Sequence, residues 1–309
     1  MSALSQHLDE YLRLRRVLGH DLAEAGRVLP RFVTYLEVRD AEFVTVKAAL
    51  DWSLEPDAPA GSTVWGRRMM VVRGFARYLS GIDARTEVPP AGAIPNRQRW
   101  RPPFIYSEAD IVALMDQAAQ SIPQPLRAAT YQTLIGLLAA TGLRIGEALR
   151  LDRHDVDCSD GVLLVRKSKF RKSRQVPLQT STLHALQKYN HHREKHCPHP
   201  SSERFFVSLR GTRIIYESVS KTFRMLCNRT GVGAGAPHPP RMHDLRHTFA
   251  VRTLLGWYRD GQDVQARMQW LSTYLGHREP RYTYHYLSAA PELLGHAARL
   301  LERDQAVRP

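Results

Sequence analysis

Four separated segments of the chain contain side chains that bind anions or transfer protons. The first reads Thr141-Gly-Leu-Arg144-Ile-Gly-Glu147, a glycine turn followed by an arginine at the expected start of a helix. Backbone N–H groups point outward at a helix start, so together with the guanidinium of Arg144 they would form a phosphate-binding site. An arginine after a glycine is more often an ordinary surface residue, so this segment alone is weak evidence for a phosphate-binding site.

The second segment, residues 166–174, reads Arg-Lys-Ser-Lys-Phe-Arg-Lys-Ser-Arg and has six basic residues in nine. The alternating stretches 162–166 and 174–178 on either side predict a β-hairpin with this basic tip. A basic hairpin suits insertion into a DNA groove, and a lysine in it can contact phosphate or act as a general acid. The alternative is a charged turn in solvent.

The third segment is His243-Asp-Leu-Arg246-His247. On a helix, His243 shares a face with Arg246 and with His247, so an imidazole and a guanidinium can reach one anion. The two histidines also have the spacing of metal ligands. No glutamate directly follows His243, however, so the zinc-protease pattern fails.

The fourth segment runs from Leu275-Gly-His277 to Tyr286 and places three tyrosines near a histidine. If this stretch is helical, Tyr282 and Tyr286 share a face and Tyr284 is turned away.

Taken in order, these segments resemble the catalytic domain of tyrosine recombinases, which include phage integrases, Xer-type resolvases and transposon-borne relatives. The shared pattern is TGLRxxE, a basic hairpin ending in R-x-V-P-L, H-x-x-R-H, L-G-H, and a tyrosine nine residues beyond that histidine. The resemblance spans residues 104–290, and the helical residues 1–80 resemble the core DNA-binding domain of that family.

The resemblance implies a role for each matching residue. Arg144 and Arg246 would hold the scissile phosphate, and His243 and His277 would complete the anion-binding set. Tyr286 would be the nucleophile, because its spacing from His277 fits that of the family.

Three further positions are assigned in the same way. Lys169 would be the hairpin lysine, chosen by counting back from Arg174 and Val176-Pro-Leu178. This sequence has Ser168 and Phe170 where the family often has glycine, so the hairpin tip is expected to differ in shape. Glu147 matches an orienting acidic residue, and His247 a position that supports the helix.

The implied reaction is transesterification of a DNA phosphodiester through a 3′-phosphotyrosyl intermediate. Two guanidiniums and two imidazoles can stabilise the transition-state charge without a metal ion, and the covalent link conserves the phosphoester energy. We therefore expect no cofactor. The expected partner is double-stranded DNA with specific recombination sites. The expected role is integration, excision or transposition of a mobile element.

Two alternatives remain open. A type IB topoisomerase-like enzyme would use the same chemistry to relax DNA, and a catalytically idle DNA-binding protein could share the fold. The complete set of arginines, lysine, histidines and tyrosine disfavours the second.

The elements that must position these residues are mostly helices with a small antiparallel sheet. Apolar residues recur at helical spacing over residues 1–80, with Thr45 as a cap and a longer helix over 63–79. Ser107 and Asp110 form a capping box, and a short strand is expected at 205–208. We expect a helical core DNA-binding domain over 1–82, a basic Pro-rich linker over 83–103 and a catalytic domain over 104–309.

The charge supports a polyanionic partner. The 309-residue chain has a formal charge of +14; residues 1–99 hold 14 Lys and Arg against 12 Asp and Glu, and the rest holds 30 against 18. Such an excess favours contact with nucleic acid. The basic residues expected to contact DNA are Arg67, Arg68, Arg73, Arg97, Arg99, Lys167, Arg171, Lys172 and Arg174.

The sequence after Tyr286 predicts a C-terminal helix with an apolar face, which packs either on its own domain or on a neighbouring protomer. The resemblance favours the neighbour, giving a homo- or hetero-tetramer on DNA.

Three cysteines without a CxxC pair, no signal sequence and no membrane-spanning run indicate a cytoplasmic, nucleoid-associated protein. The histidine-rich stretch 191–199 is crowded rather than spaced for zinc, so no metal is expected.

Overall fold

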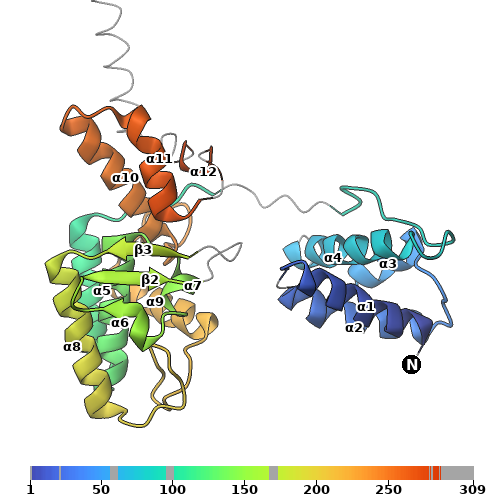
Figure 1. Ribbon diagram of the computed structural model, residues 1–309, viewed down its shortest axis with the longest axis horizontal. Helices are drawn as coiled ribbons and strands as arrows, with labels where there is room; N and C mark the ends of the chain where they lie inside the picture. Colours follow the sequence, from blue (N-terminus) through green and yellow to red (C-terminus); the bar gives the residue numbers. More distant parts are fainter. Residues whose placement is uncertain are drawn as a thin grey trace, which may run out of the picture. The chain divides into compact units, whose positions relative to one another are not determined.

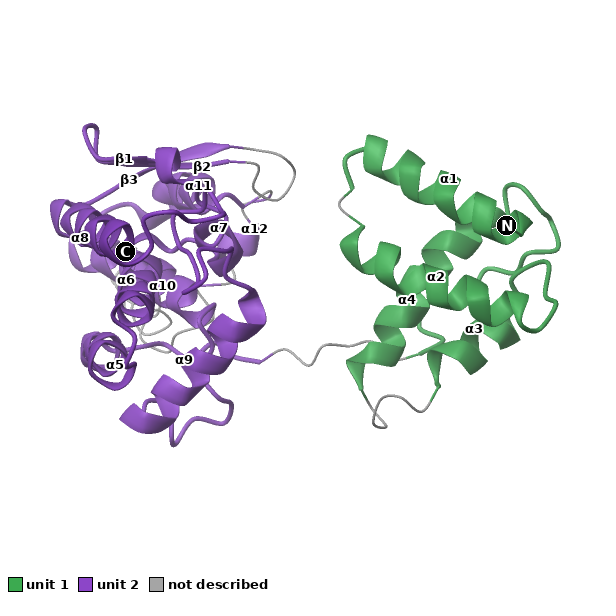
Figure 2. Cartoon of the chain, turned by 90° about the horizontal axis from the view of Figure 1, so that it is seen from below, with its two compact units in different colours: residues 1–100 green, residues 101–309 purple. Residues whose placement is uncertain are grey.

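The structure, a computed structural model, describes residues 2–20, 22–55, 62–94, 101–166, 173–277, 279, 281–284 and 286. The chain forms two compact units, residues 1–100 and residues 101–309 (Figure 2). Helices make up most of the described secondary structure, and one small antiparallel sheet accompanies them in the second unit. The expected fold class is confirmed.

The first unit is a bundle of four helices. These are α1 (Ala3–Val17), α2 (Ala23–Glu37), α3 (Val46–Ser53) and α4 (Thr63–Leu79). The predicted cap is present: the Thr45 hydroxyl accepts a hydrogen bond from the amide of Ala48 at 3.0 Å. Helix α4 has the predicted bounds, and apolar side chains from all four helices form the core of this unit.

Part of the expected linker packs on the first unit. The amide of Glu87 donates to the carbonyl of Val44 at 2.8 Å, and the Glu87 carboxylate accepts from the amide of Val46 at 2.6 Å. Thr86 and Ile94 are buried. Residues 95–100, which include Arg97 and Arg99, lie outside the described residues.

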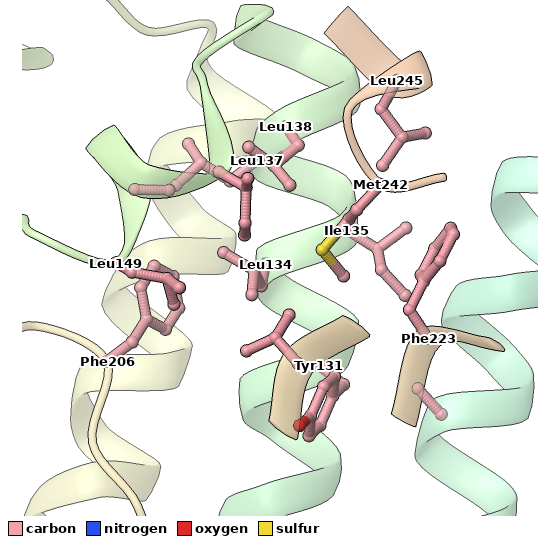
Figure 3. Packing of buried hydrophobic residues seen from close by; sticks show 14 of the residues in the cluster. Tyr131, Leu134, Ile135, Leu137, Leu138, Leu149, Phe206, Phe223, Met242 and Leu245 are labelled. Carbon is pink, nitrogen blue, oxygen red and sulfur yellow. The ribbon is translucent and has the colours of Figure 1, made fainter. Parts of the chain in front are cut away.

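The second unit is built around α6. Its helices are α5 (Glu108–Ser121), α6 (Pro125–Thr141), α7 (Ile145–Ala148), the 3₁₀ helix η1 (Arg153–Asp155), α8 (Thr180–His196), α9 (Tyr216–Thr230), α10 (Asp244–Arg259), α11 (Val264–Leu275) and α12 (Arg281–Tyr284). Helix α6 is apolar on most of its surface, so it is buried, and it packs against α5, α8 and α10 (Figure 1). Figure 3 shows Leu134 and Ile135 of α6 in this core, with Phe223 of α9 and Met242 from the turn before α10.

The predicted capping box at Ser107 and the predicted β-hairpin are both present in this unit. The Ser107 hydroxyl accepts from the amide of Asp110 and the Asp110 carboxylate accepts from the amide of Ser107, which confirms the capping box. Strands β2 (Val162–Val165) and β3 (Arg174–Pro177) pair antiparallel, with Val165 opposite Arg174, which confirms the hairpin. The tip, residues 167–172, lies outside the described residues.

The sheet also differs from expectation. Strand β1 (Val156–Asp157) pairs with β2 and gives the order β1-β2-β3. The strand expected at 205–208 is absent there: isolated bridges join Asp152 to Arg204 and Val207 to Arg213 instead. Phe205 and Phe206 both pack into the core beside Tyr189. This pair of apolar residues therefore reflects burial in the core and not the alternation of a strand.

Helices α10 and α11 enclose a smaller core of their own. Val251 and Leu254 of α10 cluster there with Met268 and Leu271 of α11, and Tyr286 joins the same cluster. Helix α10 carries Arg246 and His247 and is preceded by His243, and His277 follows the C-cap of α11. Among the described residues, no helix combines the length and apolar character needed to span a bilayer.

Candidate active site

Arg144 is positioned by the turn that ends α6. Gly142 adopts a left-handed conformation with φ of 61°, which ends the helix and turns the chain toward α7. Arg144 then occupies the N-cap position of α7, and its amide donates to Oε2 of Glu147 at 3.0 Å. Its side chain remains half-buried, and Nη1 donates to Oε1 of Glu147 at 2.7 Å.

Glu147 is the buried acid of the site, with a side chain only 1% exposed. Arg174 reaches it from β3: Nη1 lies 3.2 Å from Oε1 and Nη2 lies 2.9 Å from Oε2. Burial alone would raise the pKa of Glu147, but the hydrogen bonds and charges of Arg174 and Arg144 outweigh burial and lower this pKa to about 2. Glu147 is therefore an anion at neutral pH and orients two arginines.

Arg246 projects from α10 and is almost completely buried, at 1% exposure. Its Nη1 donates to the carbonyl of Gly142 at 2.8 Å, so the turn that positions Arg144 also holds Arg246. Burial and the charge of Arg144 lower the pKa of Arg246 to about 10, and interaction with Tyr286 opposes this. The guanidinium is still cationic at neutral pH.

Three arginines meet at the C-terminus of α11. They donate to three consecutive carbonyls: Arg174 Nε to Tyr274 at 2.7 Å, Arg246 Nη2 to Leu275 at 2.6 Å, and Arg144 Nη2 to Gly276 at 3.0 Å. The last carbonyls of a helix lack intrahelical partners and carry partial negative charge, so they attract cations. Guanidiniums from β3, α10 and the start of α7 therefore meet at this helix end.

His277 follows directly on this helix end. Its Nε2 lies 2.9 Å from Nη2 of Arg246, and its Nδ1 lies 2.8 Å from the hydroxyl of Thr283. Burial, followed by the charges of Arg246 and Arg144, lowers the pKa of His277 to about 3. His277 is thus neutral in this arrangement.

His243 and His247 lie at the start of α10. Burial is the largest cause lowering the pKa of His243, and the charge of Arg246 is the next. The rings of His243 and His247 meet edge to face, with centroids 5.1 Å apart. The predicted common face for His243, Arg246 and His247 is consistent with these contacts.

Tyr286 contacts two histidine rings. Its ring centroid is 5.3 Å from that of His247 and 5.9 Å from that of His277. The residue is buried at 3% exposure, whereas Tyr282 is 50% exposed. The expected common helical face for Tyr282 and Tyr286 is wrong, because α12 ends at Tyr284 and Tyr286 follows in a turn.

The structure thus brings together six of the residues singled out for this site. They are Arg144, Glu147, His243, Arg246, His277 and Tyr286, with His247 in contact. Two guanidiniums and neutral imidazoles around a phenol can bind a tetrahedral anion beside an oxygen nucleophile. Lys167, Lys169, Arg171 and Lys172 lie outside the described residues.

The arginines expected to contact DNA occupy different environments. Arg67 is exposed and lies 3.6 Å from Glu24, and Arg73 is half-buried. Arg68 is buried, with its guanidinium 5.4 Å from the ring centroid of Trp52. Arg174 points inward to Glu147, as described above.

Two features of the site were not predicted from the sequence. Thr283 is fully buried and orients His277, but nothing in Arg281-Tyr-Thr-Tyr marks it as more than a residue between tyrosines. The convergence of three arginines on α11 depends on tertiary packing. Within the described part of the chain, no group of His, Cys, Asp and Glu side chains is suited to hold a metal ion.

Several known proteins resemble this chain in sequence or in fold. The sequence profile of the Phage integrase family matches residues 106–292. A Sinorhizobium fredii protein named as an integrase/recombinase, y4rB, is 40% identical over 98% of this chain and 98% of its own length. The tyrosine recombinase XerD of Mycobacterium tuberculosis is 27% identical over 92% of this chain and 91% of its own. Among solved structures, the Tn1549 transposon integrase in complex with a circular intermediate DNA has a TM-score of 0.65 at 17% identity, covering 96% of this chain and 99% of that one.

Proposed function

Since the chain belongs to the phage integrase family and is a tyrosine-type DNA recombinase, we propose that it cuts and rejoins DNA at specific sites through a covalent 3′-phosphotyrosyl intermediate on Tyr286. The observation that carries this proposal is the position of the Tyr286 phenol. Its ring stacks on His277 and meets His247 edge to face, beside the buried guanidinium of Arg246. Tyr282 and Tyr284, by contrast, are exposed.

In the cleavage step, the Tyr286 oxygen attacks phosphorus and the bond from phosphorus to the 5′-oxygen breaks. The phenol loses its proton to a neutral imidazole, for which His243 is our choice, and the departing 5′-oxygen takes a proton from Lys169. The lowered pKa of His243 supports its neutral state. A 5′-hydroxyl of a second strand then attacks the phosphotyrosine and restores Tyr286, so no external energy source is required.

Arg144 and Arg246 stabilise the charge that develops on the non-bridging oxygens. Both guanidiniums are held in place before substrate arrives, Arg246 by the carbonyls of Gly142 and Leu275 and Arg144 by Glu147 and Gly276. A preorganised donor set of this kind avoids reorganisation during the reaction. His277 accepts a hydrogen bond from Arg246 and so helps to hold this guanidinium beside the phosphate.

The substrate we propose is double-stranded DNA carrying specific recombination sites, and the biological task is movement of a mobile element. The name of the Sinorhizobium fredii integrase/recombinase supports this task, as does the net charge of +14. In this proposal residues 1–82 bind the core DNA, with Arg67 and Arg73 facing the backbone.

We further propose that the enzyme acts as a homo- or hetero-tetramer on DNA through its C-terminal helix. Residues 287–309 lie outside the described residues, so this step rests on the family alone. Deleting residues 290–309 tests it: loss of synapsis with retained DNA binding is expected, and unchanged synapsis would contradict it.

The test of the nucleophile uses a nicked suicide substrate whose cleaved end diffuses away, which traps the covalent protein–DNA adduct. We expect the unmodified chain to form the adduct and Tyr286→Phe to form none. Tyr282→Phe and Tyr284→Phe are matched controls that retain it. An adduct with Tyr286→Phe would refute the assignment, and relaxation of supercoiled DNA without paired sites would favour the topoisomerase-like alternative.

A further inference from the structure

We propose that Arg174 is a positioning residue for Arg144, acting through Glu147, and not the DNA contact that its place in the basic hairpin suggested. This inference rests on the proposed function, because the group positioned is an arginine that holds the scissile phosphate. Arg174 touches neither the phosphate nor the nucleophile in this assignment.

The contacts of Arg174 are directed into the protein. Its two Nη atoms form a double hydrogen bond with the carboxylate of Glu147, and Nε donates to the carbonyl of Tyr274 at 2.7 Å. All three side-chain nitrogens are therefore engaged, and the side chain is 13% exposed. A paired, planar contact of this type fixes both partners, which a lysine cannot reproduce.

The charges explain why Arg144 needs this partner. Glu147 carries one negative charge in a nearly inaccessible position, and Arg144 and Arg174 each contribute one positive charge. With Arg174 present the trio has a net charge of +1, which is left to attract a phosphate. Without Arg174, Glu147 and Arg144 would form a neutral pair, and the carboxylate would compete with the phosphate for Arg144.

The packing around Arg174 also links it to Arg144. Gly276, whose carbonyl accepts from Arg144, has a left-handed φ of 67° and no side chain where Arg174 lies. A Cβ placed there would stand 2.9 Å from Nη1 of Arg174 and 3.2 Å from its Cζ. The guanidinium thus lies directly over the residue that anchors Arg144.

Arg174→Met provides the test, since it keeps the side-chain volume and removes the charge. Single-turnover adduct formation would be measured at saturating protein on suicide DNA, with DNA affinity measured separately at several salt concentrations. We expect the rate to fall by about 10- to 100-fold, the usual effect of losing an orienting partner. The dissociation constant and its salt dependence should stay unchanged, because no phosphate contact is lost.

A second substrate separates positioning from general damage to the structure. A methylphosphonate at the scissile position is neutral, so it needs less stabilisation from Arg144, and the Arg174→Met defect should shrink several-fold on it. Arg204→Met is the control: Arg204 pairs with Asp152 at 3.0 Å in the same unit and has no contact with Glu147 in the described structure. Its rate ratio on the two substrates should match that of the unmodified chain.

Two outcomes would overturn the inference. If Arg174→Met weakened DNA binding tenfold or more and reduced the salt slope by about one, Arg174 would be a phosphate contact. If the rate fell equally on both substrates, its role would be structural only. Arg174→Gln, which also removes the charge, gives the same readouts should Arg174→Met fail to fold. A wild-type chain that forms no Tyr286-dependent adduct would refute the proposed function instead.

Discussion

Nη2 of Arg246 donates a hydrogen bond to Nε2 of His277 across 2.9 Å. A guanidinium has only donors, so Nε2 must be the acceptor and the proton of the imidazole must reside on Nδ1. Nδ1 in turn lies 2.8 Å from the hydroxyl of Thr283. His277 is thereby held in one neutral tautomer, and protonating it requires breaking its contact with Arg246.

This contact predicts a pH-dependent stability. Burial and the neighbouring arginines lower the pKa of His277 to about 3, whereas a histidine in an unfolded chain has a pKa of about 6.5. Between these values the unfolded chain binds more protons, so the free energy of unfolding should fall as pH drops below about 6.5. The lowered pKa of His243 acts in the same direction.

The measurement is urea unfolding at about pH 5 and about pH 7.5, above the range in which most carboxylates titrate. His277→Asn should reduce the stability difference between the two pH values relative to the unmodified chain. His154→Asn, at an exposed position, is the control and should leave it unchanged. An unaltered difference in His277→Asn would contradict the inferred neutral state.

Gly142→Ala should damage both stability and catalysis. Gly142 has a φ of 61°, and an added Cβ would lie 2.5 Å from Cδ1 of Phe249 and 3.2 Å from Cδ2 of Leu275. The carbonyl of Gly142 also holds Arg246. We expect a loss of about 2 to 4 kcal/mol, from backbone strain together with overpacking.

Gly231→Ala isolates the backbone contribution to this loss. Gly231 has a similar φ of 72°, but a Cβ there meets nothing within 4 Å. The free energy of unfolding should fall by only about 1 to 2 kcal/mol in Gly231→Ala, and adduct formation should be retained. Equal losses in the two variants would show that contact with Phe249 does not matter.

Asp155→Asn should loosen the base of the β-hairpin. The carboxylate of Asp155 is buried, pairs with Arg166 at the end of β2 and accepts from the amide of Asp152 at 2.9 Å. Replacing it removes a charged partner from a buried position, so we expect a loss of about 1 to 3 kcal/mol in thermal or urea unfolding. Asp157→Asn, at the exposed end of β1, should cost less than about 1 kcal/mol, and a larger loss there would contradict this ranking.

Much of this fold is determined by signals that lie close together in the sequence. The caps at Thr45 and Ser107 and the alternation before Arg166 and after Arg174 are local, and they placed α3, α5 and the hairpin correctly. Phe205 was misread because a buried aromatic pair in a loop has the same composition as a short strand.

The candidate site was only partly accessible from the sequence. The ordered motifs gave Arg144, Arg246 and His277, which the structure brings together at the end of α11. The inward direction of Arg174 was not predictable, because a run of basic residues carries no signal for which of them faces a buried acid. That acid, Glu147, lies 27 residues away in the chain.

Thr248→Val tests how α10 is tied to the segment that enters the second unit. The buried Thr248 hydroxyl accepts from the amide of Tyr106 at 3.0 Å and donates to the carbonyl of Asp244 at 3.0 Å. Valine has nearly the same shape but cannot accept, so the buried amide of Tyr106 loses its partner. We expect the free energy of unfolding to fall by about 1 to 3 kcal/mol.

Thr253→Val is the matched control on the same helix. The Thr253 hydroxyl likewise donates to a carbonyl one turn earlier, that of Phe249 at 2.9 Å, but no backbone amide of the described residues donates to it. Its loss should be within about 0.5 kcal/mol, as for substitutions that leave no buried group unpaired. Hydrogen exchange at the Tyr106 amide gives the local readout: it should become faster in Thr248→Val and stay unchanged in Thr253→Val. Equal protection in both variants would mean that the contact with Thr248 does not hold this segment on α10, the helix that presents Arg246.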